Sequence, residues 1–164
     1  MRTTTSELTF SLPVDSYLKD SREFPIADKN KCIDKLWSIG QDHDWYYGQW
    51  LWNLRGRIDK FLGGRGMGSK RTSEEKLLPG DNVDFWKVIE SDREGGRLLL
   101  QATMKMPGKA WLEFKVNDLK ITQTVFFQPS GLWGRLYWYS LQPLHNLMFQ
   151  GLIEKHAFNC SMTK

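Results

Sequence analysis

The sequence has few of the residues that form disulfides. Its 164 residues include two cysteines, Cys32 and Cys160, which lie far apart along the chain. Cys32 falls on the apolar side of a predicted helix, where a thiol behaves as a small hydrophobic group. We therefore predict two reduced thiols in a cytoplasmic protein, with a disulfide as the less favoured alternative.

Histidine is also scarce, and the three histidines do not predict a metal site. His43 stands between Asp42 and Asp44, but one imidazole with two carboxylates at consecutive positions is a weak ligand set. The nucleophile motif GxSxG is absent. The stretch GGRGMG (63–68) follows a predicted helix instead of opening one, which is the wrong context for a dinucleotide fingerprint. We therefore expect no bound metal and no cofactor.

No sustained basic or apolar run occurs. The net charge is +4 and the basic residues are scattered, so we expect no nucleic-acid partner. The most apolar segment, 132–153, is interrupted by Arg135 and several amides, whereas a bilayer span needs about 20 apolar residues. Its polar line is poor in lysine, which favours a core helix over a membrane-surface helix. The start, MRTTTSELTF, has no apolar signal-peptide segment, so we expect a cytoplasmic protein without membrane contact.

Aromatic residues, in contrast, are abundant. The chain has eight tryptophans, and five of the ten residues in HDWYYGQWLW (43–52) are Trp or Tyr. Residues two apart on a helix point about 200° away from each other, so Trp50 and Trp52 cannot share a face. Core packing, the lining of a cavity and a protein-interaction patch all remain open for this stretch. We assign Tyr46 and Trp50 to a cavity.

The spacing of apolar residues predicts an α+β fold. A strand over 22–28 leads to Asp28, a favourable helix N-cap, and Gly40 stops the helix that follows. The predicted helices span 29–39, 49–62 and a long C-terminal segment from Leu132 that Pro143 should kink. Alternating apolar residues predict an antiparallel meander with strands at 83–90, 97–106, 110–116 and 119–128. In the second helix the predicted core face comprises Leu51, Leu54, Ile58, Phe61 and Leu62.

This element order predicts a helix-grip arrangement. A sheet with one apolar face must be covered, and the long C-terminal helix is the available cover. A curved sheet that wraps around one helix leaves a space suited to a small molecule. We predict an N-terminal extension or linker remnant at 1–20, one domain at 21–158 and a C-terminal tail at 159–164.

Several long stretches resemble a bacterial family of unknown function. They are HDWYYGQWLWNLRGRIDKFLGG, GDNVDFWKV, KMPGKAWLEF and ITQTVFFQPSGLWGRLYWYSLQPLHNLMFQG, and the resemblance covers about 22–153. The family belongs to the START-like (SRPBCC, polyketide-cyclase-like) superfamily, which implies a helix-grip fold of the START/Bet v 1 type. In longer members the domain follows a short-chain-dehydrogenase or NmrA-like NAD(P)-binding domain. The resemblance thus implies a dehydrogenase-type partner and assigns no catalytic residues.

We predict that the domain binds a small hydrophobic or amphipathic molecule between the sheet and the C-terminal helix. The ligand-binding residues that we predict are Tyr46, Trp50, Trp86, Leu112, Phe114, Tyr137 and Phe149.

Two alternative functions use the same fold. In the first, a cyclase- or isomerase-like enzyme uses Glu113 or His145 as a proton carrier. Each residue also has a non-catalytic interpretation. Glu113 could be exposed on the outer face and paired with Lys105, and His145 could be a structural residue. In the second, an accessory domain serves a dehydrogenase-type partner through an exposed apolar patch that includes Trp45 or Trp133.

Overall fold

The computed structural model of the chain describes residues 17–41, 49–61, 63 and 76–161, and the structural statements below concern these. The elements in chain order are β1 (Leu18–Pro25), α1 (Lys29–Trp37), α2 (Gln49–Phe61), β2 (Asn82–Val83), β3 (Trp86–Asp92), β4 (Arg97–Ala102), β5 (Gly108–Val116), β6 (Lys120–Pro129) and α3 (Gly131–Ser161). The predicted helices at 29–39 and 49–62 correspond to α1 and α2. The predicted long helix corresponds to α3, which begins one residue earlier than expected.

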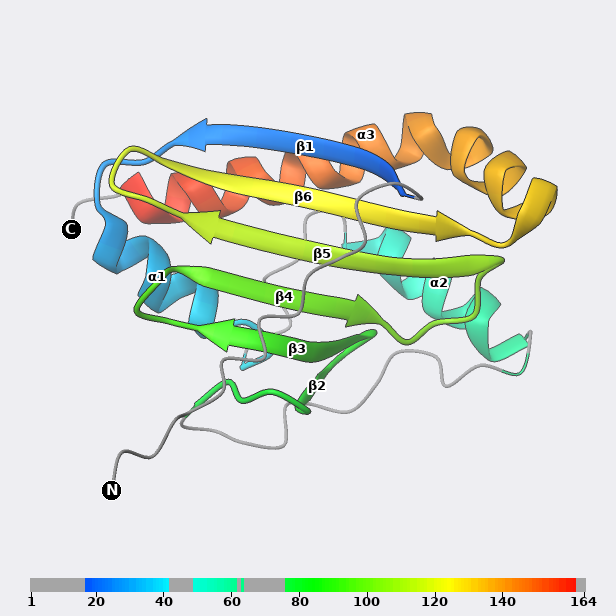
Figure 1. Cartoon of the computed structure of the whole chain (residues 1–164), viewed down its shortest axis with the longest axis horizontal. Coiled ribbons are helices and arrows are strands. Elements are labelled where there is room, and N and C mark those ends of the chain that lie inside the picture. Colours follow the sequence, from blue (N-terminus) through cyan, green and yellow to red (C-terminus); the bar gives the residue numbers. More distant parts are fainter. Residues whose placement is uncertain (1–16, 42–48, 62, 64–75, 162–164) are drawn as a thin grey trace, which may run out of the picture.

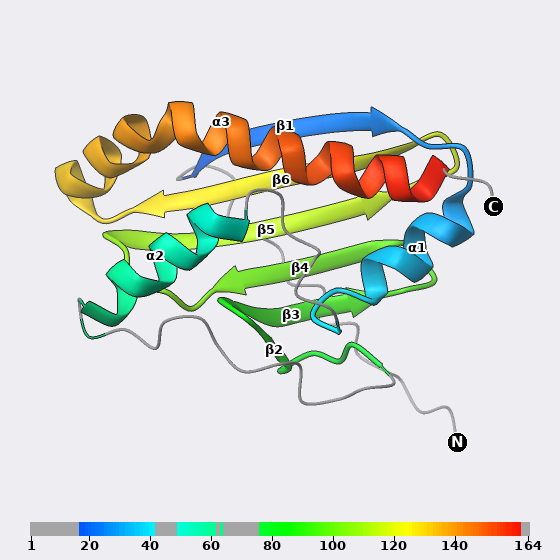
Figure 2. The same ribbon diagram turned by 180° about the vertical axis from the view of Figure 1, so that it is seen from behind.

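The strands form one antiparallel sheet of order β1-β6-β5-β4-β3-β2. The first strand of the chain pairs with the last, with Leu18 opposite Phe127 and Pro25 opposite Lys120. All three described helices lie on one side of this curved sheet (Figure 1). Viewed from that side, α3 runs along β1 and β6, while α1 and α2 lie beside it at opposite ends of the sheet (Figure 2). The predicted α+β fold, with a C-terminal helix packed on a curved antiparallel sheet, is confirmed.

Helix α1 begins and ends for local reasons that the sequence predicts. The side chain of Asp28 accepts a hydrogen bond from the backbone N–H of Lys31 at 3.1 Å, which satisfies one of the unpaired donors of the first turn. Beyond the helix, Gly40 has a φ of +80° and packs so closely on Val83 that a Cβ would lie 2.6 Å from its Cγ1. Glycine is therefore required at this position both for its backbone conformation and for space.

The inner face of the sheet carries the hydrophobic core. On β5 the alternate residues Ala110, Leu112, Phe114 and Val116 are all buried, as their spacing predicts. They pack with buried residues of α1 and α3, such as Leu36 and Ile153. Full burial of each large apolar side chain stabilises the fold by roughly 1.5–3 kcal/mol.

A polar clamp from β1 holds α3 against the edge of the sheet. Arg22 donates to the backbone carbonyl of Asn146 at 3.0 Å, to its side-chain oxygen at 2.8 Å and to Oε1 of Gln150 at 3.1 Å. The same guanidinium also donates to Asp20 at 2.8 Å. Asn146 and Gln150 stand one helical turn apart, so a single arginine engages two successive turns of the helix.

Helix α3 is 31 residues long and contains Pro143. Proline removes one backbone donor inside a helix, and Figure 1 shows α3 curving along its length. In the part of the chain that the structure describes, none of the helices combines the length and hydropathy that crossing a membrane requires.

The sheet departs from the predicted strand boundaries near Trp86. Val83 pairs with Trp86 across a two-residue turn, so a short hairpin precedes the meander. Asp84 adopts a φ of +51° in this turn, a conformation that short polar side chains tolerate better than most. Strand β4 ends at Ala102 instead of continuing to 106. The next residue, Thr103, donates to the carbonyl of Phe85 through both its N–H and its hydroxyl.

Helix α2 has the predicted bounds to within a residue, but its apolar face is not buried in the core. Leu54 and Ile58 are partly exposed, and Phe61 is 90% exposed. The prediction of a core face is therefore wrong for these three side chains, and those of Leu51 and Leu62 lie outside the described part. Apolar spacing shows that a helix has two unlike faces, and it does not show what the apolar face contacts.

The state of the first cysteine also differs from the prediction. Cys32 is disulfide-bonded, so the expected reduced thiol is wrong at this position. Separation along the sequence could not indicate this, because a disulfide depends on how close two Cα atoms come in the fold. The side chain of Cys160 lies outside the described part. The predicted reduced cysteines therefore no longer support a cytoplasmic location, which stays a prediction.

The outer face of the sheet contains a buried ion-pair cluster. Glu113 is only 5% exposed; Arg97 donates to it at 2.8 Å, and Lys115 lies 3.4 Å from its second oxygen. Arg97 also contacts Glu90 at 2.6 Å. Burial lowers the pKa of Arg97, but hydrogen bonds and charges from Glu113 and then Glu90 raise it overall. The non-catalytic interpretation of Glu113 as an exposed partner of Lys105 is therefore wrong, because Glu113 is buried and pairs with Arg97 and Lys115.

Replacing Glu113 with Gln should lower the free energy of unfolding by about 2 kcal/mol, because Arg97 then stays partly buried with one counter-charge fewer. Urea denaturation at pH 7 measures this loss. The matched control is Glu23→Gln, which removes the carboxylate of the exposed pair with Lys120 at 2.6 Å. The control should change stability by less than about 0.5 kcal/mol. Equal effects of the two substitutions would contradict a structural role for the buried cluster.

Candidate functional site

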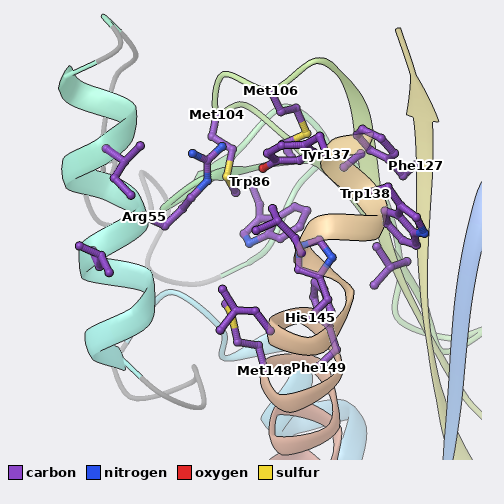
Figure 3. A pocket seen from close by; sticks show the side chains of 17 residues that line it. Arg55, Trp86, Met104, Met106, Phe127, Tyr137, Trp138, His145, Met148 and Phe149 are labelled. Carbon is purple, nitrogen blue, oxygen red and sulfur yellow. The ribbon is translucent and has the colours of Figure 1, made fainter. Parts of the chain in front are cut away.

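A cavity of about 320 Å³ lies between the inner face of the sheet, α2 and α3 (Figure 3). Its walls are mainly aromatic rings and thioethers. The large side chains that line it are Trp86, Phe127, Tyr137, Trp138, Phe149, Met104, Met106 and Met148. Methionine adapts its shape readily, which suits a wall that closes around ligands of different outline.

The cavity exists because the inner face of the sheet carries small side chains at one end. On β5 the inner row begins with Gly108 and Ala110 and continues with Leu112 and Phe114. On β4 the inner row ends at Ala102, which lies opposite Trp86 on β3. Both alanines line the cavity, while the larger residues fill the sheet–helix interface farther along. Because the inner-face residues change from small to large along these strands, a space remains at one end of the interface between the sheet and α3.

The opposite wall is one face of α3. Tyr137, Leu141, Leu144, His145 and Met148 line the cavity at helical spacing. Next to them, Trp138 stacks on Phe127 of β6, with ring centroids 5.4 Å apart and an interplanar angle of 9°. This stack holds the amino-terminal half of α3 onto the sheet beside the cavity.

Two buried polar atoms of the wall lack a hydrogen-bond partner among the described residues. They are Nε1 of Trp86 and Nδ1 of His145. A buried polar group without a partner costs about 1–3 kcal/mol, so two in one apolar cavity indicate that something beyond the described side chains satisfies them. Both residues come from elements that face the cavity from opposite sides.

His145 is neutral at physiological pH. Its ring lies between Trp138 and Phe149, with centroid distances of 5.6 and 5.5 Å. Burial lowers the pKa of His145 to about 4; Asp20 opposes this shift, and the positive charges of Arg55 and Arg22 reinforce it. A neutral imidazole has one donor and one acceptor nitrogen.

Arg55 of α2 is the only charged side chain that lines the cavity among the described residues. Its Nη2 donates to the backbone carbonyl of Lys105 at 2.7 Å, which ties α2 to the connection between β4 and β5. Figure 3 shows Arg55 reaching from α2 toward the sheet, with the hydroxyl of Tyr137 pointing to the same side of the cavity.

The structure brings together some of the residues predicted from sequence and separates others. Trp86, Tyr137, Phe149 and His145 all line the cavity. The predicted residues that do not line it are Trp50, which is 67% exposed on α2, and Leu112 and Phe114, which are fully buried in the core. Tyr46 lies outside the described residues, as do Trp45, His43 and most of the aromatic stretch.

Leu112 and Phe114 are separated from the site for a simple reason. Alternation along β5 indicates the direction of each side chain, but not which end of the strand borders a space. Trp50 stands at the start of α2, whereas the described side chains of α2 that line the cavity are Leu54, Arg55 and Ile58.

Sequence reasoning missed Arg55, Trp138 and the three methionines. Met148 had a usable signal, because it stands three residues after His145 and shares its helix face. Trp138 adjoins Tyr137, which was predicted. Nothing in the sequence indicated Arg55, because a charged residue on an amphipathic helix is normally assigned to the solvent-facing side.

The chemistry that this site offers is limited. Glu113 is on the opposite face of the sheet from the cavity, bound to Arg97, and cannot pair with His145. No described carboxylate lines the cavity, so His145 has no acid partner there. Within the described ranges, no group of three or more His, Cys, Asp or Glu side chains could hold a metal ion. The arrangement favours binding over acid–base catalysis.

Residues 12–152 match the family described as "Protein of unknown function (DUF2867)". The match covers most of the chain, and the chain belongs to this family. The matched region includes all the described residues that line the cavity. Comparison with curated proteins finds no significant match. Membership in a family of unknown function agrees with the resemblance seen in the sequence.

The lowered pKa of His145 predicts a loss of stability in acid. Between pH 6.5 and about 4 the unfolded chain binds a proton at this residue and the folded chain does not. The stability is therefore complete above pH 6.5 and falls as the pH approaches 4, by up to about 3 kcal/mol from this residue. A His145→Gln variant should lose this part of the pH dependence while its carboxylates titrate as before. Urea unfolding of both proteins from pH 4 to 7.5 measures the difference, and parallel stability curves would contradict the prediction.

Proposed function

We propose that the protein binds a small hydrophobic or amphipathic molecule in the cavity between the sheet and α3. The observation that carries this proposal is the cavity itself, whose volume of about 320 Å³ is lined almost entirely by apolar side chains. Small-molecule sites typically measure about 300–1,000 Å³ and have few, well-placed polar groups. Empty apolar cavities destabilise proteins, so a ligand that fills this one would recover packing energy.

The arrangement of the sheet supports a wider assignment. The strand order and the single long helix held by the sheet are what we would expect of a START-like helix-grip domain, and we propose that superfamily for this chain. Trp86, Tyr137 and Phe149 are the predicted ligand-binding residues that we retain, and we add Met104, Met106 and Met148 of the walls.

Binding of the uncharged dye N-phenylnaphthylamine tests the proposal. Trp86 and Trp138 line the cavity, so a bound dye should quench tryptophan emission by energy transfer. Ala102→Phe should weaken dye binding about tenfold or more, because the ring occupies the cavity. The control is Leu119→Phe, which adds the same ring at an exposed position in the turn between β5 and β6.

The two variants separate binding in the cavity from adsorption to the surface. Thermal unfolding should show that Ala102→Phe is folded before its affinity is compared. The proposal fails if the wild-type protein does not bind the dye. It also fails if a folded Ala102→Phe variant binds the dye as well as the wild type does.

An accessory role beside a dehydrogenase-type protein is the second candidate. It is favoured by the start of α3, where Leu132, Leu136 and Trp133 are exposed, the last to 78%. Adjacent exposed apolar side chains of this size commonly mark protein-interaction sites.

For this candidate, Trp133→Ser should abolish retention of an NAD(P)-binding protein in a pull-down from cell extract, with retained proteins identified by mass spectrometry. Leu119→Ser is the control, because Leu119 is equally exposed and lies at the β5–β6 turn. Retention of the same protein by wild type and Trp133→Ser would exclude this surface.

A further inference from the structure

We infer that the natural ligand is an anionic amphipath, whose apolar body fills the cavity and whose oxyanion, such as a carboxylate, binds Arg55 at its edge. This inference rests on the proposed function and goes further by naming the charge and the position of the ligand's head group.

The charge distribution around the cavity supports an anion. Arg55 contributes a fixed positive charge, and no carboxylate of the described residues lines the walls to balance it. The acid that acts most strongly on His145 is Asp20, which is already bound to Arg22 at 2.8 Å. An anionic head group would therefore meet an arginine, whereas a cationic one would meet repulsion with no compensating acid.

The geometry of Arg55 suits an oxyanion. A guanidinium has five N–H donors in a planar fork, and the hydrogen bond to the carbonyl of Lys105 uses one of them. That bond orients the side chain, which reduces the conformational freedom lost when an anion binds. The planar fork matches two oxygens of a carboxylate.

The interior of the cavity favours a ligand with one further polar atom. Nε1 of Trp86 is a donor, and Nδ1 of His145 belongs to an imidazole that is neutral at pH 7. Each is buried without a described partner, so an oxygen on the ligand body would satisfy a group that is otherwise left unpaired. The remaining wall is apolar and accepts hydrocarbon.

A series of three ligands with one chain and different head groups tests this inference. Decanoate, decanol and decylammonium are each titrated against the protein with bound N-phenylnaphthylamine, below their micelle concentrations and at pH 7. Decanoate should displace the dye with an affinity about tenfold higher than decanol, the size expected for a hydrogen-bonded ion pair at a partly exposed site. Decylammonium should bind most weakly.

Substitutions on α2 assign the preference to one side chain. Arg55→Gln should reduce the preference for decanoate over decanol to about twofold or less. The preference is compared within one variant, so an effect of the lost bond to Lys105 on both ligands cancels. Arg55→Lys keeps the charge and should retain part of the preference. Arg57→Gln is the matched control, because it removes the same charge from an exposed position of the same helix that does not line the cavity. It should behave as the wild type does.

The outcomes distinguish this inference from the function on which it rests. Equal binding of decanoate and decanol by the wild type overturns the anionic ligand but leaves the cavity as a binding site. A preference for decanoate that survives in Arg55→Gln, or that disappears in Arg57→Gln, also overturns the inference and leaves the cavity as a binding site. If neither the dye nor any of the three amphiphiles binds, the proposed function itself fails.

Discussion

The stacking of Trp138 on Phe127 is the contact on which the site depends. It holds the amino-terminal half of α3 at a fixed height above β6, with the rings nearly parallel and 5.4 Å apart. Farther along the helix, the amide of Gln123 donates to the carbonyl of Phe149 at 3.1 Å, and Arg22 donates to Asn146 and Gln150. With the helix held at these points, any shortage of side-chain volume beneath it must become a cavity.

That shortage comes from two alanines. Ala102 and Ala110 border the cavity, whereas Leu112 and Phe114 fill the same layer at the other end of the sheet. The protein thus divides one sheet–helix interface into a packed half and an open half. The packed half supplies the burial that stabilises the fold, and the open half is available for a ligand. Arg55 and the two ring nitrogens without a partner among the described residues all belong to the open half.

The two faces of the sheet separate the charged groups by role. The position of Glu113 between aromatic residues in the sequence makes it a candidate proton carrier. Its contacts with Arg97 and Lys115 place it in an ion-pair cluster on the face away from the cavity. His145, the other candidate, does line the cavity, but its neighbours are aromatic rings and its pKa is low. Among the described residues, no carboxylate joins it in the cavity wall.

The sequence by itself determined where most helices and strands lie and which face of β5 is buried. The N-cap at Asp28 and the alternation from Ala110 to Val116 depend on neighbours within a few residues, so the sequence predicts them correctly. Only the tertiary structure decided which end of the sheet stays open, that Arg55 faces the cavity and that Cys32 is disulfide-bonded. It also decided that Glu113 pairs with Arg97 across two strands and that the apolar face of α2 is left partly exposed. These features depend on the distance between segments far apart in the chain, which periodicity does not encode.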